Sequence, residues 1–439
     1  MQETRRGEDD NSPGEPPGRA FGALRHRDFQ LFWGGAVLSH IAGWMAQVAQ
    51  AWLVYELTGS ALLVGLSGLF QSVPFIALSF YAGTLIDRVD RRRLLIWVEL
   101  ANALVTFGLA ILIATGRVQL WHLYLLGSLH GLIGAFESPA RSALLPHLVP
   151  RADLMTAVSL QSIQRKGAQI VGPALGGIFL AAFGVAPSYF IHASSFLVVM
   201  GSLALLSTTN PATSRVGEPP LQAILAGIRY VRGQPIIGGL IVMEASMSIF
   251  GSYNAMMVIF AREVFHAGPE GLGWLQSAAG LGSVAGSLVL GAFGDVKQKS
   301  RLLFTAGLLY ASLLVAFAFS PWFALALPLL ALAGAMDIIF GAVRQTVIQL
   351  LTRDEMLGRV MSLSAISMRG LGTFGGFQAG ALTSALGSVQ LATGVGAMVC
   401  IAVLLGVGLR VPGLRSLSGS APSGSTIANA RSDPQPTRP

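Results

Sequence analysis

The chain has 439 residues, of which 53% are hydrophobic and only 11% are charged, and its mean hydropathy is +0.63. Soluble domains carry about 25% charged residues, so this composition excludes an ordinary water-exposed globular surface and indicates a membrane protein. The formal net charge of +8 is distributed over short segments between apolar runs, which favours a role in membrane orientation over nucleic-acid binding.

Both ends of the chain are polar. Residues 1–20 are rich in Pro, Gly and acidic residues, and no apolar segment of signal-peptide type follows a basic one. Residues 412–439 are rich in Ser, Pro and Ala. We therefore expect a disordered cytoplasmic tail at each end.

Between the tails, the sequence alternates apolar runs with short polar loops. A helix needs about 20 apolar residues to cross the hydrocarbon core of a bilayer. We expect an all-α membrane protein with twelve transmembrane helices, at 29–54, 61–86, 93–115, 119–140, 157–184, 186–207, 236–261, 269–294, 301–320, 322–350, 359–387 and 388–410.

The loops after the even-numbered spans hold most of the basic residues, and the opposite loops hold little beyond Arg117 and Arg262. Basic loops stay on the cytoplasmic side. An even number of spans also places both termini on one side, so both arguments predict cytoplasmic termini. The basic residues in question are Arg88, Arg91, Arg92, Arg93, Arg151, Arg215, Arg229, Arg232, Lys297, Lys299, Arg301, Arg353 and Arg359.

The two halves of the chain resemble each other at a shift of about 203–208 residues. Arg141 corresponds to Arg344, Gly172 to Gly375, and Asp87 to Asp295. A shift of six spans relates the halves by an axis along the membrane normal. We expect two pseudo-symmetric six-helix bundles, at 21–207 and 236–411, joined by a cytoplasmic linker at 208–235. A cleft between such bundles is typical of a secondary transporter that works by alternating access. The sequence contains no GxxxxGK[ST] motif, so it gives no indication that ATP is used directly.

The loop after the second span contains the sequence Gly-Thr-Leu-Ile-Asp-Arg-Val-Asp-Arg-Arg at 83–92. This stretch resembles the G-x-L-x-D-R-x-G-R-R motif of the major facilitator superfamily, from which it departs at Asp90. The resemblance implies a conformational gate in which acidic and basic side chains hold helix ends together; the alternative is that the arginines only orient the chain. The gate residues would be Gly83, Asp87, Arg88, Arg91, Arg92, Glu99 and Arg141.

The fifth span contains a second motif, Gly172, Pro173, Gly176 and Gly177 in the pattern G-P-x-x-G-G. It is similar to the antiporter motif of the same superfamily, which is found mainly in exporters, although Ala168 stands where a further glycine is expected. A span that is merely kinked and tightly packed is the alternative. The entry segment 21–33 also resembles the branch that includes enterobactin exporters and macrolide-efflux pumps, and the resemblance covers roughly 21–410.

Three carboxylates within the spans are candidates for proton coupling, because charges in hydrocarbon are costly. Glu137 is one helical turn from Arg141, Asp337 is two turns from Arg344, and Glu244 has no basic residue at helical spacing. Structural ion pairing is the alternative for each carboxylate. We interpret His40, His130 and His192, which also lie within spans, as packing residues.

Polar and aromatic side chains in the first, second and seventh spans are candidates for a substrate cavity, with core packing as the alternative. Such a mixture suits a small, mainly apolar ligand. The cavity candidates are Trp44, Gln47, Gln50, Gln71, Tyr253 and Asn254.

The resulting hypothesis is a multi-pass protein of the bacterial plasma (inner) membrane that exports small, largely apolar molecules of the drug or siderophore class in antiport with protons. A monomer is expected, since its two halves already form a cleft. We expect no cofactor, no metal site and no nucleic-acid partner, and Cys400, the single cysteine, excludes an internal disulfide. The alternatives are an importer or symporter and, remotely, a membrane-embedded enzyme, for which the sequence shows no catalytic motif. The substrate, the coupling ion and the proton-carrying carboxylate stay open.

Overall fold

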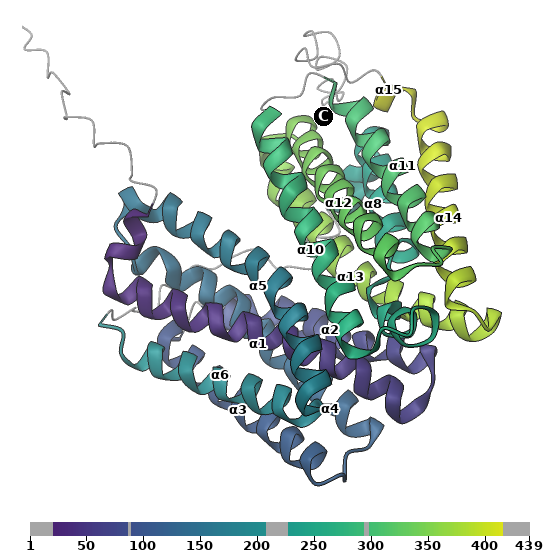
Figure 1. The fold of residues 1–439 in the computed structure, drawn as a ribbon. Coiled ribbons are helices and arrows are strands. Elements are labelled where there is room, and N and C mark those ends of the chain that lie inside the picture. Colours follow the sequence, from purple (N-terminus) through teal and green to yellow (C-terminus); the bar gives the residue numbers. More distant parts are fainter. Residues whose placement is uncertain (1–20, 87–88, 208–226, 294–297, 416–439) are drawn as a thin grey trace, which may run out of the picture.

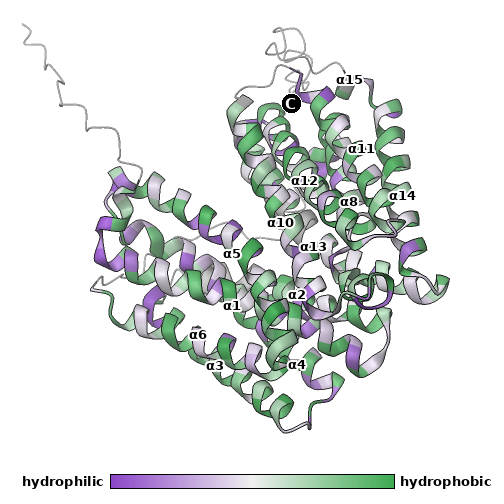
Figure 2. Ribbon diagram, in the orientation of Figure 1, coloured by the Kyte–Doolittle hydropathy of each residue, from purple (hydrophilic) through white to green (hydrophobic). Residues whose placement is uncertain are grey.

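The computed structural model describes residues 21–86, 89–207, 227–293 and 298–415, and these ranges are almost entirely helical, without a strand. Its helices form two bundles (Figure 1). Hydrophobic residues cover most of the length of the helices, and many strongly hydrophilic ones lie near helix ends (Figure 2). Large apolar side chains such as Leu288, Leu409 and Trp121 are exposed, as expected for a surface that faces lipid rather than water.

The N-terminal bundle is built from six long helices that fall on the first six predicted spans. Short 3-10 turns precede α1 and connect α4 to α5. The elements are η1 (Gly22–Arg25), α1 (Arg27–Thr58), α2 (Ala61–Ile86), α3 (Arg91–Ala114), α4 (Leu120–Leu144), η2 (Leu145–His147), η3 (Arg151–Asp153), α5 (Leu154–Phe183) and α6 (Val185–Ala204).

The C-terminal bundle also follows the predicted spans. Its long helices are α8 (Pro235–Phe250), α10 (Gly268–Phe293), α11 (Lys299–Ala318), α12 (Phe323–Leu351), α13 (Asp354–Leu386) and α14 (Val389–Arg410), and the short α15 (Pro412–Arg415) follows. The predicted tail 1–20, residues 416–439 of the predicted tail 412–439, and most of the predicted linker lie outside the described residues, whereas residues 412–415 form α15. The predicted domain limits therefore stay predictions.

The seventh span differs from the expected continuous helix over 236–261. Helix α8 ends at Phe250, and the chain continues through η4 (Asn254–Met256), α9 (Met257–Ile259) and a π-helical turn, η5 (Phe260–Val264). The Tyr310 hydroxyl donates a hydrogen bond to the Gly251 carbonyl at 2.9 Å. A hydrogen bond from another helix thus satisfies the backbone where the helix is interrupted.

Within the described residues, nine segments are long and apolar enough to cross a bilayer, and the interrupted segment Pro235–Val264 is one of them. The other three predicted spans coincide with α1, α4 and α13, which are 32, 25 and 33 residues long. The structure is thus consistent with twelve spans. Helices α1 and α4 carry polar side chains that face the interior of their bundle, as described below.

The two bundles meet through α2 against α13 and α5 against α10, and they diverge from that junction in Figure 1. Glycines allow the backbones to approach closely. A Cβ atom at Gly177 would lie 2.6 Å from the Pro269 carbonyl oxygen and 3.0 Å from Cα of Gly273, and Gly65 is in direct contact with the Gly376 carbonyl. These contacts lie toward the helix ends that are remote from the basic loops.

We predict that Gly177→Leu lowers the free energy of unfolding by about 1–3 kcal/mol, because the added side chain has no room between two backbones. Gly167→Leu on the same helix is the matched control, since a Cβ there meets nothing within 4 Å. Tryptophan fluorescence of the purified protein in mild detergent measures the apparent Tm. Equal values of Tm for the two variants would contradict a close contact at Gly177.

Candidate transport site

A cavity of about 490 Å³ lies within the N-terminal bundle. Its wall combines aromatic rings, neutral polar groups and one carboxylate, contributed by α1, α2, α3, α4 and α6. The lining residues are Ser39, His40, Gly43, Trp44, Gln47, Gln71, Ser72, Phe75, Ile76, Asn102, His130, Gly131, Gly134, Glu137, His192 and Phe196.

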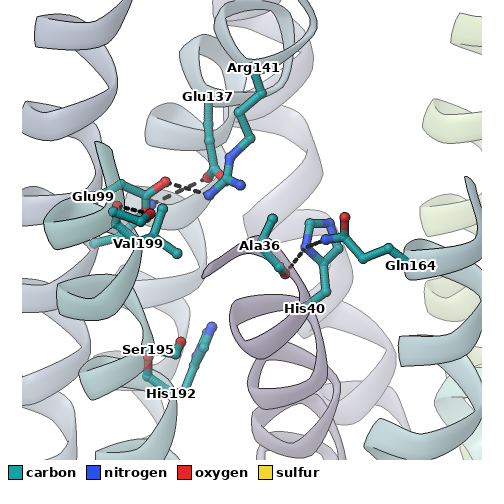
Figure 3. Close-up of polar contacts among 11 residues, drawn as sticks. Ala36, His40, Glu99, Glu137, Arg141, Gln164, His192, Ser195 and Val199 are labelled. Atoms are coloured by element: carbon teal, nitrogen blue, oxygen red, sulfur yellow. Dashed lines mark hydrogen bonds and ion pairs between the residues drawn. The ribbon is translucent and has the colours of Figure 1, made fainter. Parts of the chain in front are cut away.

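A buried cluster of two carboxylates and one arginine adjoins this cavity (Figure 3). Arg141 Nη2 lies 2.6 Å from Oε1 of Glu99, and Arg141 Nε lies 2.9 Å from Oε1 of Glu137. The Glu99 side chain is fully buried, whereas the Glu137 side chain is 25% exposed and reaches the cavity wall. With both carboxylates ionised, the cluster carries one uncompensated negative charge, so a single proton would neutralise it.

A chain of polar side chains extends from this cluster along the cavity. Asn102 Nδ2 donates to Oε2 of Glu137 at 3.4 Å, and Thr106 Oγ1 lies 3.0 Å from Nε2 of His130. The ring centroids of His130 and His192 are 6.1 Å apart. Groups from α3, α4 and α6 thus connect the interior of the cavity to the ion cluster.

The histidines are the functional candidates that sequence reasoning missed, because it interpreted them as packing residues. On α5, Gln164 reaches Nδ1 of His40 across the gap to α1, at 3.2 Å (Figure 3). One signal was available in the sequence: His40, Trp44 and Gln47 are spaced so that they share one face of a helix. His130 and His192 come from different helices, and only the tertiary structure brings them together.

The predicted cavity residues divide into two groups. Trp44, Gln47 and Gln71 line the cavity, and Gln50 is half-buried on α1 outside its lining. Tyr253 is buried in the C-terminal bundle, 6.2 Å from Phe317 between ring centroids. Asn254 is exposed at the start of η4. The structure therefore does not bring these last two residues to the N-terminal cavity.

Glu244 has no basic residue at helical spacing, but it pairs with an arginine of another helix, as the ion-pairing alternative predicts. Arg344 Nε lies 2.8 Å from Oε2 of Glu244, and Arg344 Nη1 donates to Ser364 Oγ at 2.9 Å. Helical spacing could not reveal the pair because its members belong to α8 and α12. Asp337 is exposed on α12. It interacts electrostatically with Glu244, with Arg344 and with Lys166, which belongs to α5 of the other bundle.

The predicted gate is only partly within the described residues. Asp87 and Arg88 lie outside them, and Gly83 lies in α2. Asp90 accepts hydrogen bonds from the backbone amides of Arg92 and Arg93, so the residue that departs from the superfamily motif caps α3. Its role at the helix start is a physical reason for an aspartate at this position.

The two described arginines of the motif make contacts within the N-terminal bundle. Arg92 donates to the carbonyl oxygens of Leu203 and Ala204 at 2.8 and 2.6 Å, and so caps the end of α6. Arg91 Nη1 lies 3.4 Å from His147 Nε2. These contacts tie α3 to its neighbours, and the gating role itself stays a prediction.

The glycines of the fifth span pack against two different helices. Gly172 and Gly176 pack against Trp44 and Met45 of α1, whereas Gly177 packs against α10. The Pro173 carbonyl oxygen is in contact with Gly273. Helix α5 therefore connects a cavity-lining helix directly to the junction between the bundles.

The model of one protein family, described as "Transmembrane secretion effector", matches residues 18–427 of this chain. The chain belongs to this family of major facilitator superfamily transporters. It is thus a multi-pass membrane transporter, as the loop motif and the two-bundle arrangement predict.

Relatives of this transporter include proteins named enterobactin exporter EntS. The protein from Shigella boydii serotype 18 is 27% identical over 315 residues, which cover 72% of each chain. The protein from Citrobacter koseri has the same identity and coverage. A third, from Shigella boydii serotype 4, is 26% identical over 340 residues, or 77% of this chain and 81% of the relative.

Solved structures of transporters share the fold. A bacterial homologue of the iron transporter ferroportin, in the inward-facing state, has a TM-score of 0.66 at 15% identity and covers 89% of this chain and 99% of its own. The peptide transporter POT has a TM-score of 0.72 at 12% identity, with 92% and 98% covered. These likenesses confirm the superfamily fold.

We predict that Arg141→Met destabilises the transporter by about 3 kcal/mol or more, because it leaves the buried Glu99 carboxylate without a counter-charge. Adding Glu99→Gln should recover most of that loss. The apparent Tm of the single and double variants measures both effects, with Arg229→Met at an exposed site as the control. A double variant no more stable than Arg141→Met would show that the ion cluster does not carry the effect.

Proposed function

We propose that the chain exports small organic molecules of the siderophore or drug class from the cytoplasm across the bacterial inner membrane, in exchange for protons. The family match and the relatives named as enterobactin exporters support export of such molecules. The antiporter-type motif of α5, packed between α1 and α10, supports the same direction.

The observation that carries the proposal is that one carboxylate belongs to both the cavity and the ion cluster. Glu137 lines the cavity and pairs with Arg141. A ligand in the cavity therefore alters the surroundings of the group that would release a proton. Conversely, a proton on the cluster removes the negative charge that the ligand would meet.

Glu137 is our first choice for the coupling residue, with Glu99 as the buried carboxylate that shares its counter-ion. Asp337 is the second choice, because it is exposed and interacts electrostatically with Lys166 of the opposite bundle. Glu244 ranks below both, since its ion pair with Arg344 is complete in itself.

The cavity wall suits amphiphilic molecules that contain aromatic rings. Trp44, Phe75 and Phe196 offer surfaces for stacking, and Gln47 and Gln71 offer hydrogen-bond donors and acceptors. The apolar substrate class that the sequence suggested is thus extended toward molecules with several hydroxyl or carbonyl groups.

Alternating access accounts for the arrangement of the bundles. The described contacts between them lie at the helix ends remote from the basic loops. If the basic loops and both termini are cytoplasmic, the closed ends are external, and this state would receive substrate from the cytoplasm. Rocking of the bundles about the α2–α13 and α5–α10 contacts would then expose the cavity outward. We propose that a single chain suffices.

The proposal predicts uptake of substrate into inside-out membrane vesicles that contain the protein. With enterobactin and a macrolide as probes, accumulation of at least one should require a vesicle lumen more acidic than the medium, so that protons leave as substrate enters, and should collapse when an uncoupler is added. Accumulation only in right-side-out vesicles would instead favour the importer alternative.

Glu137→Gln should abolish the uncoupler-sensitive part of this accumulation while leaving exchange of substrate down its own gradient within about threefold, because its Arg141 partner keeps Glu99. Glu56→Gln, at an exposed position on α1, is the control. Unchanged proton dependence in Glu137→Gln would remove this residue as the coupling site, and Asp337→Asn then becomes the next test.

A further inference from the structure

A second cavity lies on the C-terminal bundle, between α11 and α14 near the beginning of one helix and the end of the other. Its volume is about 340 Å³. The apolar part of its wall consists of Phe304, Leu308, Leu404, Leu405 and Gly408. None of these residues lines the transport cavity, so this is a separate site.

The groove opens toward the surface that lipid covers. Leu405, in its wall, is 49% exposed, and Leu309 and Leu409 beside it are also exposed. Gly408 keeps the groove open, because a Cβ there would lie 3.0 Å from the Phe304 ring. Its α11 wall, from Ser300 to Leu308, extends about 12 Å along the helix axis.

Positive charge gathers at one end of this groove. Arg301, in its wall, is exposed in the first turn of α11, where no acidic residue is present. Its guanidinium makes no hydrogen bond or ion pair with any residue in the described part of the chain.

The beginning of a helix adds to this positive potential. The helix dipole places partial positive charge at the beginning of α11. An arginine at the same position increases that potential instead of offsetting it. The site therefore favours an anion, and a phosphate group can pair with the Arg301 guanidinium.

We propose that this groove binds an anionic phospholipid, with its phosphate at Arg301 and one acyl chain along Phe304, Leu308, Leu404 and Leu405. The charged end and the apolar groove are continuous, which matches a molecule with a charged head and a hydrocarbon tail. A soluble anion would leave the apolar part of the groove unfilled. The proposal is independent of the transported substrate.

Native mass spectrometry of the purified full-length protein in detergent tests this site, with phosphatidylglycerol and phosphatidylcholine as the two probes. The wild-type protein should retain one phosphatidylglycerol about fivefold more strongly than phosphatidylcholine, the preference expected from one arginine near a headgroup. Arg301→Gln should remove the preference. Gly408→Leu should lower retention of both lipids, because its side chain fills the groove.

Gly406→Leu on the same helix is the matched control, since a Cβ there meets nothing within 4 Å, and it should retain the lipid as the wild type does. Glycerol 3-phosphate should not compete, because it lacks the acyl chain. Equal retention by the wild type and Arg301→Gln, or full competition by glycerol 3-phosphate, would overturn the proposal. If Gly408→Leu does not fold, Leu308→Trp fills the same groove from α11.

Discussion

The guanidinium of Arg141, held between Glu99 and Glu137, is the interaction on which the N-terminal bundle depends. A charge inside a membrane protein persists only when an opposite charge or water compensates it. Here one arginine pairs with two carboxylates from neighbouring helices, at 2.6 and 2.9 Å. The cluster therefore fixes α3 against α4, and it also places an excess negative charge beside the cavity.

The corresponding position in the second half is organised differently. Arg344 follows Arg141 by about 203 residues and is likewise buried in an ion pair, but its partner Glu244 belongs to α8. That pair is electrically neutral by itself, and Asp337 of α12 adds a second carboxylate that interacts with it. The repeat has thus kept the arginine in both bundles while the acidic partners have diverged. Our proposal places proton coupling in the N-terminal bundle first because Glu137 also lines the cavity there.

The junction between the bundles is of another kind. The backbone of Gly177 packs against the Pro269 carbonyl group, and the Pro173 carbonyl group packs against the backbone of Gly273. Contacts of this type hold helices close without interlocking large side chains, which would allow the tilting that the proposed alternating access requires. Because Gly172 and Gly176 of the same helix pack on α1, a tilt at the junction is transmitted to the cavity wall.

The amino-acid sequence by itself determined the membrane-spanning segments, the repeat and the superfamily. Hydrophobic length and the loop motif are properties of consecutive residues, so they can be read without coordinates. Helical spacing also predicted the pair of Glu137 and Arg141. The tertiary structure alone decided the pairing of Glu99 with Arg141, the break after α8, and the meeting of His130 with His192 in one cavity. In each of these cases the interacting groups come from different helices, and their approach depends on how the helices pack in three dimensions.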